Sequence, residues 1–126
     1  ASIIATGEDL DDEALEIFVR YLQGDLEGRE GDGEARGEVC AAGLTWIKPL
    51  SRVPKKEVRL YAIGRNLGYG AGMQSCADAL HREAKRHLFD FECRHPGTNY
   101  SLLRGWERGL SPEVSARAKP LSKDVK

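Results

Sequence analysis

Cysteine and histidine side chains gather between residues 76 and 95, and they are the groups of this chain best suited to binding a metal ion. Thiolates and imidazoles are the usual ligands of zinc. Their spacing, C-x4-H-x5-H-x5-C-x-H, matches no structural zinc pattern, and a helix would spread them over several sides because successive residues turn by about 100°. We therefore predict no metal site and no cofactor. The residues concerned are Cys76, His81, His87, Cys93 and His95.

The carboxylates of the chain do not form a catalytic pattern in the sequence. Metal-dependent hydrolysis needs clustered acids on rigid elements. Here the acids lie in a glycine-rich stretch and at the start of one expected helix. The sequence therefore predicts no catalytic centre.

Cysteine usage and hydropathy indicate where the protein works. Three cysteines cannot all pair with one another, and none forms a C-x-x-C motif, so we expect an intracellular, reducing compartment. The nucleus, the cytoplasm and the mitochondrion stay open. No run approaches about 18 apolar residues, and the acidic N-terminus is not typical of a signal or transit peptide, so no membrane partner is expected.

Charge is distributed unevenly along the 126 residues. Residues 1–38 contain 12 Asp or Glu and 3 Lys or Arg, a net charge of −9, whereas residues 39–126 contain 8 and 16, a net charge of +8. This asymmetry favours a portion that binds a polyanion and an acidic appendage. Two ordinarily solvated faces are the alternative.

The elements that would position these groups follow from apolar spacing and from glycine and proline. A helix is predicted over Asp11–Gln23, ended by Gly24, and a second over Ser75–Phe91, with Ser75 and Asp78 resembling a capping pair. Alternating glycines at Gly68, Gly70 and Gly72 precede the second helix. Between the helices we expect a mobile acidic loop over residues 24–38, and then three strands, Leu44–Leu50, Val58–Ile63 and Leu67–Ala71. A short helix over Tyr100–Arg108 and a tail would end the chain.

The stretch Leu44–Phe91 resembles a double-stranded RNA-binding domain (dsRBD), above all that at the C-terminal end of fungal RNase III and Dicer-like enzymes. The likeness rests on the strand pair, on Leu67-Gly68-Tyr69-Gly70-Ala71-Gly72, and on the long helix after it. It implies an α/β (α+β) fold of order α-β-β-β-α, with two helices packed on one face of a three-stranded antiparallel sheet, and a C-terminal extension. The expected domains are an N-terminal tail 1–8, a dsRBD-like domain 9–95, and an extension with a tail 96–126.

The resemblance also implies which residues contact RNA. Such domains place one loop and one helix in successive minor grooves and put cations on the phosphates between them. This chain has Met73-Gln74-Ser75-Cys76 where most members carry consecutive lysines, which reduces the charge on the phosphates. The expected RNA-binding residues are Arg20, Gln23, Arg52, Lys55, Lys56, Gln74, Ser75, Arg82 and Lys85.

The expected function is recognition of double-stranded RNA by shape, as the RNA-binding portion of an RNase III-type RNA-processing enzyme. Residues 39–97, with 10 Lys or Arg against 5 Asp or Glu, favour this interpretation. The missing lysines and the acidic first helix favour an alternative, a degenerate domain that binds a protein partner or dimerises in a ribonucleoprotein. A third interpretation is an Alba-like nucleic-acid-binding protein, suggested by the strand that leads through Gly64-Arg65-Asn66 towards a helix.

Overall fold

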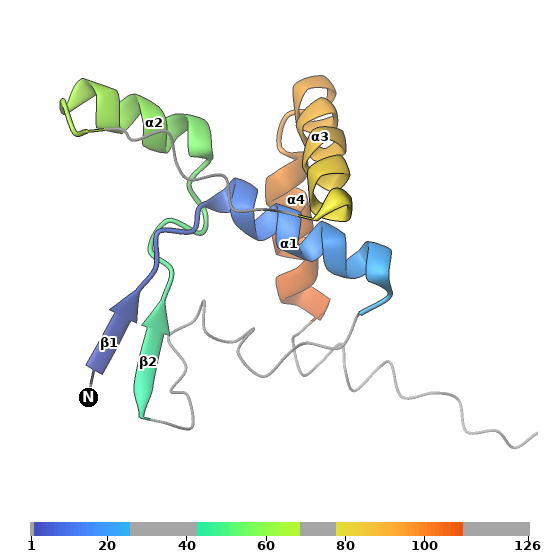
Figure 1. The fold of residues 1–126 in the computed structure, drawn as a ribbon, viewed down its shortest axis with the longest axis horizontal. Helices are drawn as coiled ribbons and strands as arrows, with labels where there is room; N and C mark the ends of the chain where they lie inside the picture. The colour runs from blue at the N-terminus through green and yellow to red at the C-terminus, as the bar shows by residue number, and fades with distance from the viewer. Residues whose placement is uncertain (1, 26–42, 69–77, 110–126) are drawn as a thin grey trace, which may run out of the picture.

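The fold consists of a helical group with a strand pair and a further helix beside it. The computed structural model describes residues 2–25, 43–68 and 78–109. Figure 1 shows α1, α3 and α4 gathered together, while the strand pair and α2 extend away from them. The elements are, in chain order, β1 (Ser2–Ala5), α1 (Leu10–Gln23), β2 (Leu44–Ile47), α2 (Lys55–Gly64), α3 (Ala79–Arg94) and α4 (Thr98–Gly109).

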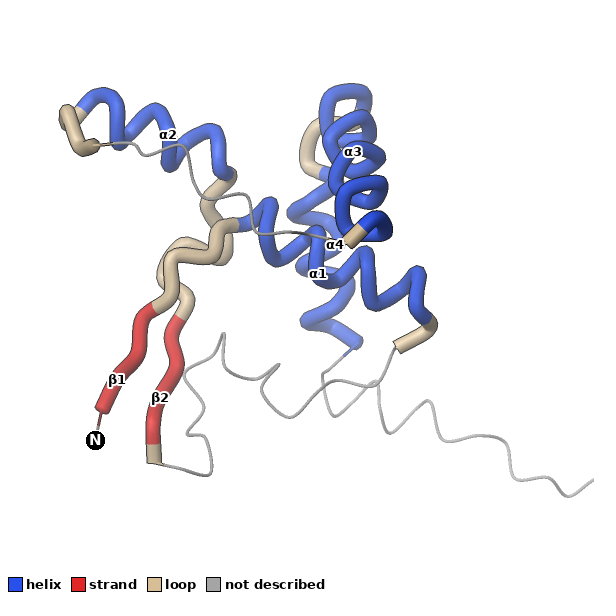
Figure 2. The backbone as a smooth tube through the Cα atoms, in the orientation of Figure 1, coloured by secondary structure: helices blue, strands red, loops and turns tan. Residues whose placement is uncertain are grey.

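The sheet in the described part of the chain has two parallel strands. Ile3 pairs with Thr45 and Ile4 with Trp46, and Figure 2 shows the two strands running side by side. The chain passes through α1 between them, as parallel strands require a long crossover connection. The expected three-stranded antiparallel sheet is therefore wrong, and with it the dsRBD order of elements, although Leu44–Ile47 lies within the first predicted strand.

Helix α1 begins and ends as its sequence dictates. Asp9 is the N-cap, and its side chain accepts the N–H of Asp12 at 3.1 Å, while the Asp12 side chain accepts the N–H of Asp9 at 3.2 Å. This reciprocal pair satisfies two of the free N–H groups of the first turn. Gly24 ends the helix in the left-handed region, with φ of 73°. The predicted helix over Asp11–Gln23 is confirmed.

The core of the described residues lies between α1 and the two C-terminal helices. Leu10 and Ile17 of α1 pack with Leu103 and Trp106 of α4 in one buried cluster. Helix α3 adds Ala84 and Leu88, which are buried as its periodicity predicts, whereas Phe91 remains half exposed. Apolar burial of this kind is the main source of stability in a small domain.

Helix α2 overturns the second predicted strand. Val58–Ile63 lies inside this helix, and none of its residues is buried. Alternation in such a short run fits a strand, but Pro54 fixes the backbone just before the first turn and most residues that follow are good helix formers. Leu67 and Gly68 belong to no strand, and residues 69–71 of the third predicted strand lie outside the described residues.

The two C-terminal helices are confirmed with shifted ends. Helix α3 starts after Asp78, whose side chain accepts the N–H of His81 at 2.8 Å, and it continues to Arg94. Residues 75–77 are outside the described residues, as are most of the acidic loop 24–38 and the tail from residue 110. None of the helices in the ranges described is long and apolar enough to cross a membrane.

Candidate functional site

The carboxyl ends of the two strands and the start of α1 meet at one place. The N–H of Thr6, just after β1, donates to the carbonyl of Ile47 at 3.0 Å, and the N–H of Leu10 donates to the carbonyl of Val53 at 3.0 Å. These bonds hold the segment after β1 against the segment after β2. In open parallel α/β sheets, ligands bind outside the carboxyl ends of the strands. This junction is therefore the candidate site.

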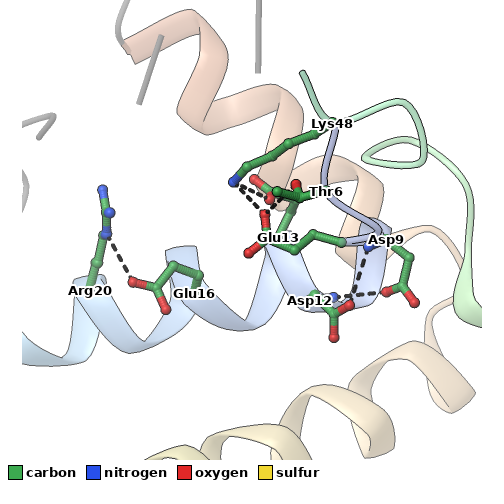
Figure 3. A network of polar contacts seen from close by, with 8 residues as sticks. Thr6, Asp9, Asp12, Glu13, Glu16, Arg20 and Lys48 are labelled. Carbon is green, nitrogen blue, oxygen red and sulfur yellow. Dashed lines mark hydrogen bonds and ion pairs between the residues drawn. The ribbon is translucent and has the colours of Figure 1, made fainter. Parts of the chain in front are cut away.

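Lys48, directly after β2, joins two carboxylates at this junction. Its Nζ lies 2.7 Å from Glu13 Oε1 and 2.8 Å from Glu8 Oε2, and Figure 3 shows the amine pointing at Glu13 of α1. Burial disfavours the charged amine, but the hydrogen bonds to Glu13 and Glu8 outweigh it and raise the pKa of Lys48 above its ordinary value. The lysine is thus held as a cation between two elements.

Lys55, at the first turn of α2, forms the second bridge. Its Nζ lies 2.8 Å from Asp12 Oδ1 and 3.6 Å from Asp9 Oδ2. Its backbone N–H donates to Asp11 Oδ2 at 3.0 Å. Burial lowers the pKa of Lys55, but the hydrogen bond to Asp12 and the nearby carboxylates outweigh burial and raise it. The start of α2 is therefore tied to the start of α1 by charge and by backbone.

Asp9 and Asp12 differ in how readily they ionise, although they share the same lysine. Burial raises the pKa of Asp9, and repulsion from Asp12 adds to this, whereas the bond from the Asp12 N–H and the Lys55 amine oppose it. Burial also acts against ionisation of Asp12, but the hydrogen bond from Lys55 and the bond from the Asp9 N–H prevail and lower its pKa. Asp12 is thus the more firmly ionised carboxylate of the pair.

Asn99 brings α4 into the same junction. Its Nδ2 donates to Asp11 Oδ1 at 2.7 Å. Asn99 is buried, and its Oδ1 has no hydrogen-bond partner among the described residues. We refer to the groups that meet here as the junction cluster. Its members are Glu8, Asp9, Asp11, Asp12, Glu13, Lys48, Lys55 and Asn99.

The structure scatters the residues that the sequence assigned to RNA. Lys55 lies in the junction cluster, and the exposed Arg52 pairs with Glu107 of α4 at 3.1 Å. Arg20 and Gln23 lie at the other end of α1, and Arg20 lies over the Trp106 ring. Arg82 and Lys85 are exposed on α3, as Lys56 is on α2, and Gln74 and Ser75 lie outside the described residues. Contact of any of them with RNA stays a prediction.

Reasoning from the sequence missed most of the junction cluster. In the sequence, Asp11, Asp12 and Glu13 are acids at the start of an expected helix, and the positive end of the helix dipole is a sufficient local reason for them. Asp9 and Lys48 were not singled out. A stronger signal was present, because an apolar stretch at Ser2–Ala5 runs within a few residues into an acidic helix start, as at the carboxyl end of a buried strand.

Known proteins resemble this chain over most of its length. It is 34% identical, over 127 residues and 93% of its length, to the tRNA 2-thiolation protein NcsA of Haloferax volcanii. It is 32% identical, over 95% of its length, to the cytoplasmic tRNA 2-thiolation protein 1 of Bos taurus. The chain is similar to tRNA 2-thiolation proteins. It spans 38% and 35% of the length of these two relatives. No protein-family model matches it.

A solved structure that resembles this chain is also that of a tRNA thiolase. The U34-tRNA thiolase NcsA from Methanococcus maripaludis, solved with its [4Fe-4S] cluster, superposes with a TM-score of 0.69 at 29% identity. The match covers 86% of this chain and 36% of that one. The fold of the chain is therefore similar to that of part of this solved structure.

These findings correct the functional expectations drawn from the sequence. The resemblance to a dsRBD of an RNase III or Dicer-like enzyme is wrong, and so are double-stranded RNA as the partner and RNase III-type processing as the context. The degenerate ribonucleoprotein module is not supported either. The misleading signal was the glycine alternation before α3, a pattern that many unrelated folds share.

Proposed function

We propose that this chain is part of a tRNA 2-thiolation protein and takes part in transferring sulfur to position 2 of a tRNA base. The observation that carries the proposal is similarity over nearly the whole chain to proteins named for this activity. A probable sulfurtransferase of Methanocaldococcus jannaschii, 29% identical over 85% of the chain, supports the same chemistry.

The junction cluster is the contribution of this chain to the site that we propose. It lies at the carboxyl ends of parallel strands, the position at which α/β folds bind ligands. Both lysines are engaged with two carboxylates each, so their charge fixes the segments after β1 and β2 in place. Asp12, with its lowered pKa, presents an ionised carboxylate that can accept hydrogen bonds from a bound group.

The [4Fe-4S] cluster of the Methanococcus protein is a separate question for this chain. Such clusters are held by cysteine thiolates. In the ranges 2–25, 43–68 and 78–109, Cys93 is the single cysteine, and no three His, Cys, Asp or Glu side chains are placed to hold a metal ion. The described residues therefore do not fit a cluster site by themselves, and we assign the cluster no role in what they do.

Two expectations from the sequence continue as parts of this proposal. An intracellular location agrees with relatives that are named cytoplasmic. The domain boundaries at residues 8 and 95 also stay proposals. They now have to accommodate β1, which pairs with β2, and the bond between Asn99 and Asp11, which crosses the second boundary.

The proposal is tested in cells that lack their own tRNA 2-thiolation protein and receive the natural protein that carries this chain. The measurement is the 2-thiouridine content of total tRNA by mass spectrometry. We expect the natural protein to restore thiolation and Asp11→Ala to reduce it at least tenfold. Glu57→Gln, at an exposed position in the first turn of α2, should leave it unchanged. A protein that is folded and expressed but leaves tRNA without 2-thiouridine would overturn the proposal.

A further inference from the structure

A shallow, open hollow lies between the C-terminal end of α1 and the turn that precedes α4, and the proposed function does not yet use it. It has a volume of about 480 Å³, within the range of small-molecule sites. Tyr21 of α1 forms one side, and the turn between α3 and α4 forms another. The lining residues are Tyr21, His95, Pro96, Gly97, Thr98, Ser101, Leu102 and Gly105.

Tyr21 presents an aromatic ring to this hollow and packs against Trp106. Its side chain is 46% exposed, and the ring meets the buried Trp106 edge to face, with the centroids 5.8 Å apart and the planes at 85°. The Arg20 guanidinium lies 5.7 Å from the centroid of the Trp106 ring. Aromatic pairs in this geometry are attractive beyond the area they bury. Tyr21 is therefore a preorganised surface.

The opposite wall is equally fixed. Glu92 accepts the N–H of Gly97 at 2.8 Å and the N–H of Asn99 at 2.9 Å. The Thr98 hydroxyl donates to the carbonyl of His95 at 2.7 Å. Gly97 has φ of 95°, a conformation that side chains disfavour, so the turn keeps its shape only with glycine there. The hollow is thus formed before anything binds.

Arginines lie close in sequence to the residues that line the hollow. Arg94 precedes His95, and Arg108 lies seven residues after Ser101, on the same side of α4. Residues 94–109 contain three arginines and one glutamate. Of the nearby acids, Glu92 is engaged by the N–H groups of Gly97 and Asn99, and Asp25 follows the end of α1. An aromatic platform beside arginines has the character of a site for single-stranded RNA, whose bases stack while cations hold the phosphates.

We propose that this hollow receives an unpaired nucleotide of tRNA, with its base stacked on Tyr21 and its phosphate near His95 and Arg108. This inference rests on the proposed function, since it names the contact through which the same protein holds its substrate. It places RNA at the end of α1 where Arg20 and Gln23 were predicted to bind it, but through a single unpaired base instead of a duplex groove.

The test measures binding of an unmodified, fluorescently labelled tRNA transcript to the natural protein that carries this chain. We expect Tyr21→Ala to weaken binding about tenfold, the effect of losing one base–aromatic stack, and Tyr21→Phe to bind within about twofold of wild type. Tyr61→Ala is the matched control, because Tyr61 is an exposed tyrosine on α2. It should bind like wild type.

A second variant does not depend on the packing of Tyr21 against Trp106. Ser101→Gln fills the hollow from an exposed helical position with a good helix former, and we expect it to weaken tRNA binding to a similar extent. A perfect duplex RNA without unpaired nucleotides should bind wild type and Tyr21→Ala alike.

The outcomes separate the two proposals. Failure of wild-type protein to bind any tRNA counts against the proposed function. Binding by wild type that Tyr21→Ala and Ser101→Gln leave unchanged, or that Tyr61→Ala weakens as much, overturns the nucleotide site and leaves the thiolation proposal standing.

Discussion

Asn99 Nδ2 donates a hydrogen bond of 2.7 Å to Asp11 Oδ1, and this bond fastens the start of α4 to the start of α1. The other oxygen of Asp11 accepts the backbone N–H of Lys55 at 3.0 Å. A single carboxylate thus joins the first turns of three helices. Asn99 Oδ1 lies beside it and has no hydrogen-bond partner in the described part of the chain, so it can still accept from a donor.

Replacement of Asp11 tests this three-way contact. Asp11→Ala should lower the free energy of unfolding by about 2 kcal/mol, because it leaves a buried amide donor and a backbone N–H without their acceptor. Asp11→Asn should cost less than about 1 kcal/mol, since its oxygen can accept from Lys55 and its amide can donate to Asn99 Oδ1. Urea unfolding of both variants measures the difference. Equal losses would show that hydrogen bonding at Asp11 contributes little.

Lys48 should matter more for stability than an exposed basic residue that also has a carboxylate partner. Lys48→Met keeps the aliphatic stem but leaves the largely buried Glu13 without its cation, so we expect a loss of about 1–2 kcal/mol. Arg52→Met is the control. Arg52 is 61% exposed in its pair with Glu107, and such pairs contribute about 0–1 kcal/mol. An Arg52 variant as unstable as the Lys48 variant would contradict the ranking.

The lowered pKa of Asp12 predicts a loss of stability in acid. A carboxyl that is more acidic folded than unfolded stabilises the fold above its ordinary pKa of 3.8, and this contribution disappears as the pH falls through the folded value. Asp12→Asn should therefore cost about 0.5–1 kcal/mol at neutral pH, a range that allows for the partial exposure of the side chain. The difference from wild type should shrink as the pH falls below 3.8 and vanish once the pH has passed the folded pKa of Asp12.

The raised pKa of Asp9 has the opposite effect on stability. The penalty for burying its charge is present above the folded pKa and disappears as the pH falls towards 3.8. Unfolding free energies of wild type, Asp12→Asn and Asp9→Asn across this pH range separate the two effects. If Asp12→Asn differed from wild type equally at neutral and acid pH, the assignment to Asp12 would be wrong.

Two isoleucines should differ sharply when truncated. Ile17 is 4% exposed in the core between α1 and α4, so Ile17→Ala should cost about 2–5 kcal/mol. Ile63 on α2 is 69% exposed, and Ile63→Ala should change stability by less than about 0.5 kcal/mol. Thermal or urea unfolding of the protein measures both changes in stability. A large cost at Ile63 would mean that α2 packs against another surface in solution.

Alanine substitution at two glycines should change the free energy of unfolding in opposite directions. Gly24→Ala forces a side chain into the left-handed region at φ of 73°, which should cost about 1 kcal/mol even though no atom of the described residues lies within 4 Å of the added Cβ. Gly105→Ala, inside α4 and equally free of clashes, should gain about 0.5–1 kcal/mol through helix propensity. Unfolding midpoints that move in the same direction would exclude this explanation.

Sequence reasoning succeeded where an element's signal lies within the element. The helices α1, α3 and α4 each repeat an apolar face over several turns, and Gly24 marks the end of α1. The prediction of a strand at α2 was wrong because ten residues with spaced apolar groups fit either a strand or a helix. The pairing of β1 with β2 was not predicted, because two short strands on either side of a helix carry no local sign of their partner.

The junction cluster was missed for a similar reason. The acids that start α1 have a sufficient local explanation, as a cap and as partners of the helix dipole. The groups that give them a further role come from distant positions: Lys48 is 35 residues from Glu13, and Asn99 is 88 residues from Asp11. The tRNA context was missed because glycine alternation has many meanings, whereas likeness to whole proteins draws on every residue.

The parallel pairing of β1 with β2 also has a kinetic consequence. Ile3 and Thr45 meet only after a loop of about forty residues has closed, and the entropy of that closure is regained through two four-residue strands that bury little side-chain surface. The packing of α1 on α4 closes a still longer loop, but it gains a buried apolar cluster, and α3 and α4 follow one another directly in the sequence. The two strands should therefore pair late in folding. Their amide protons should exchange with solvent before those of α1 and α4.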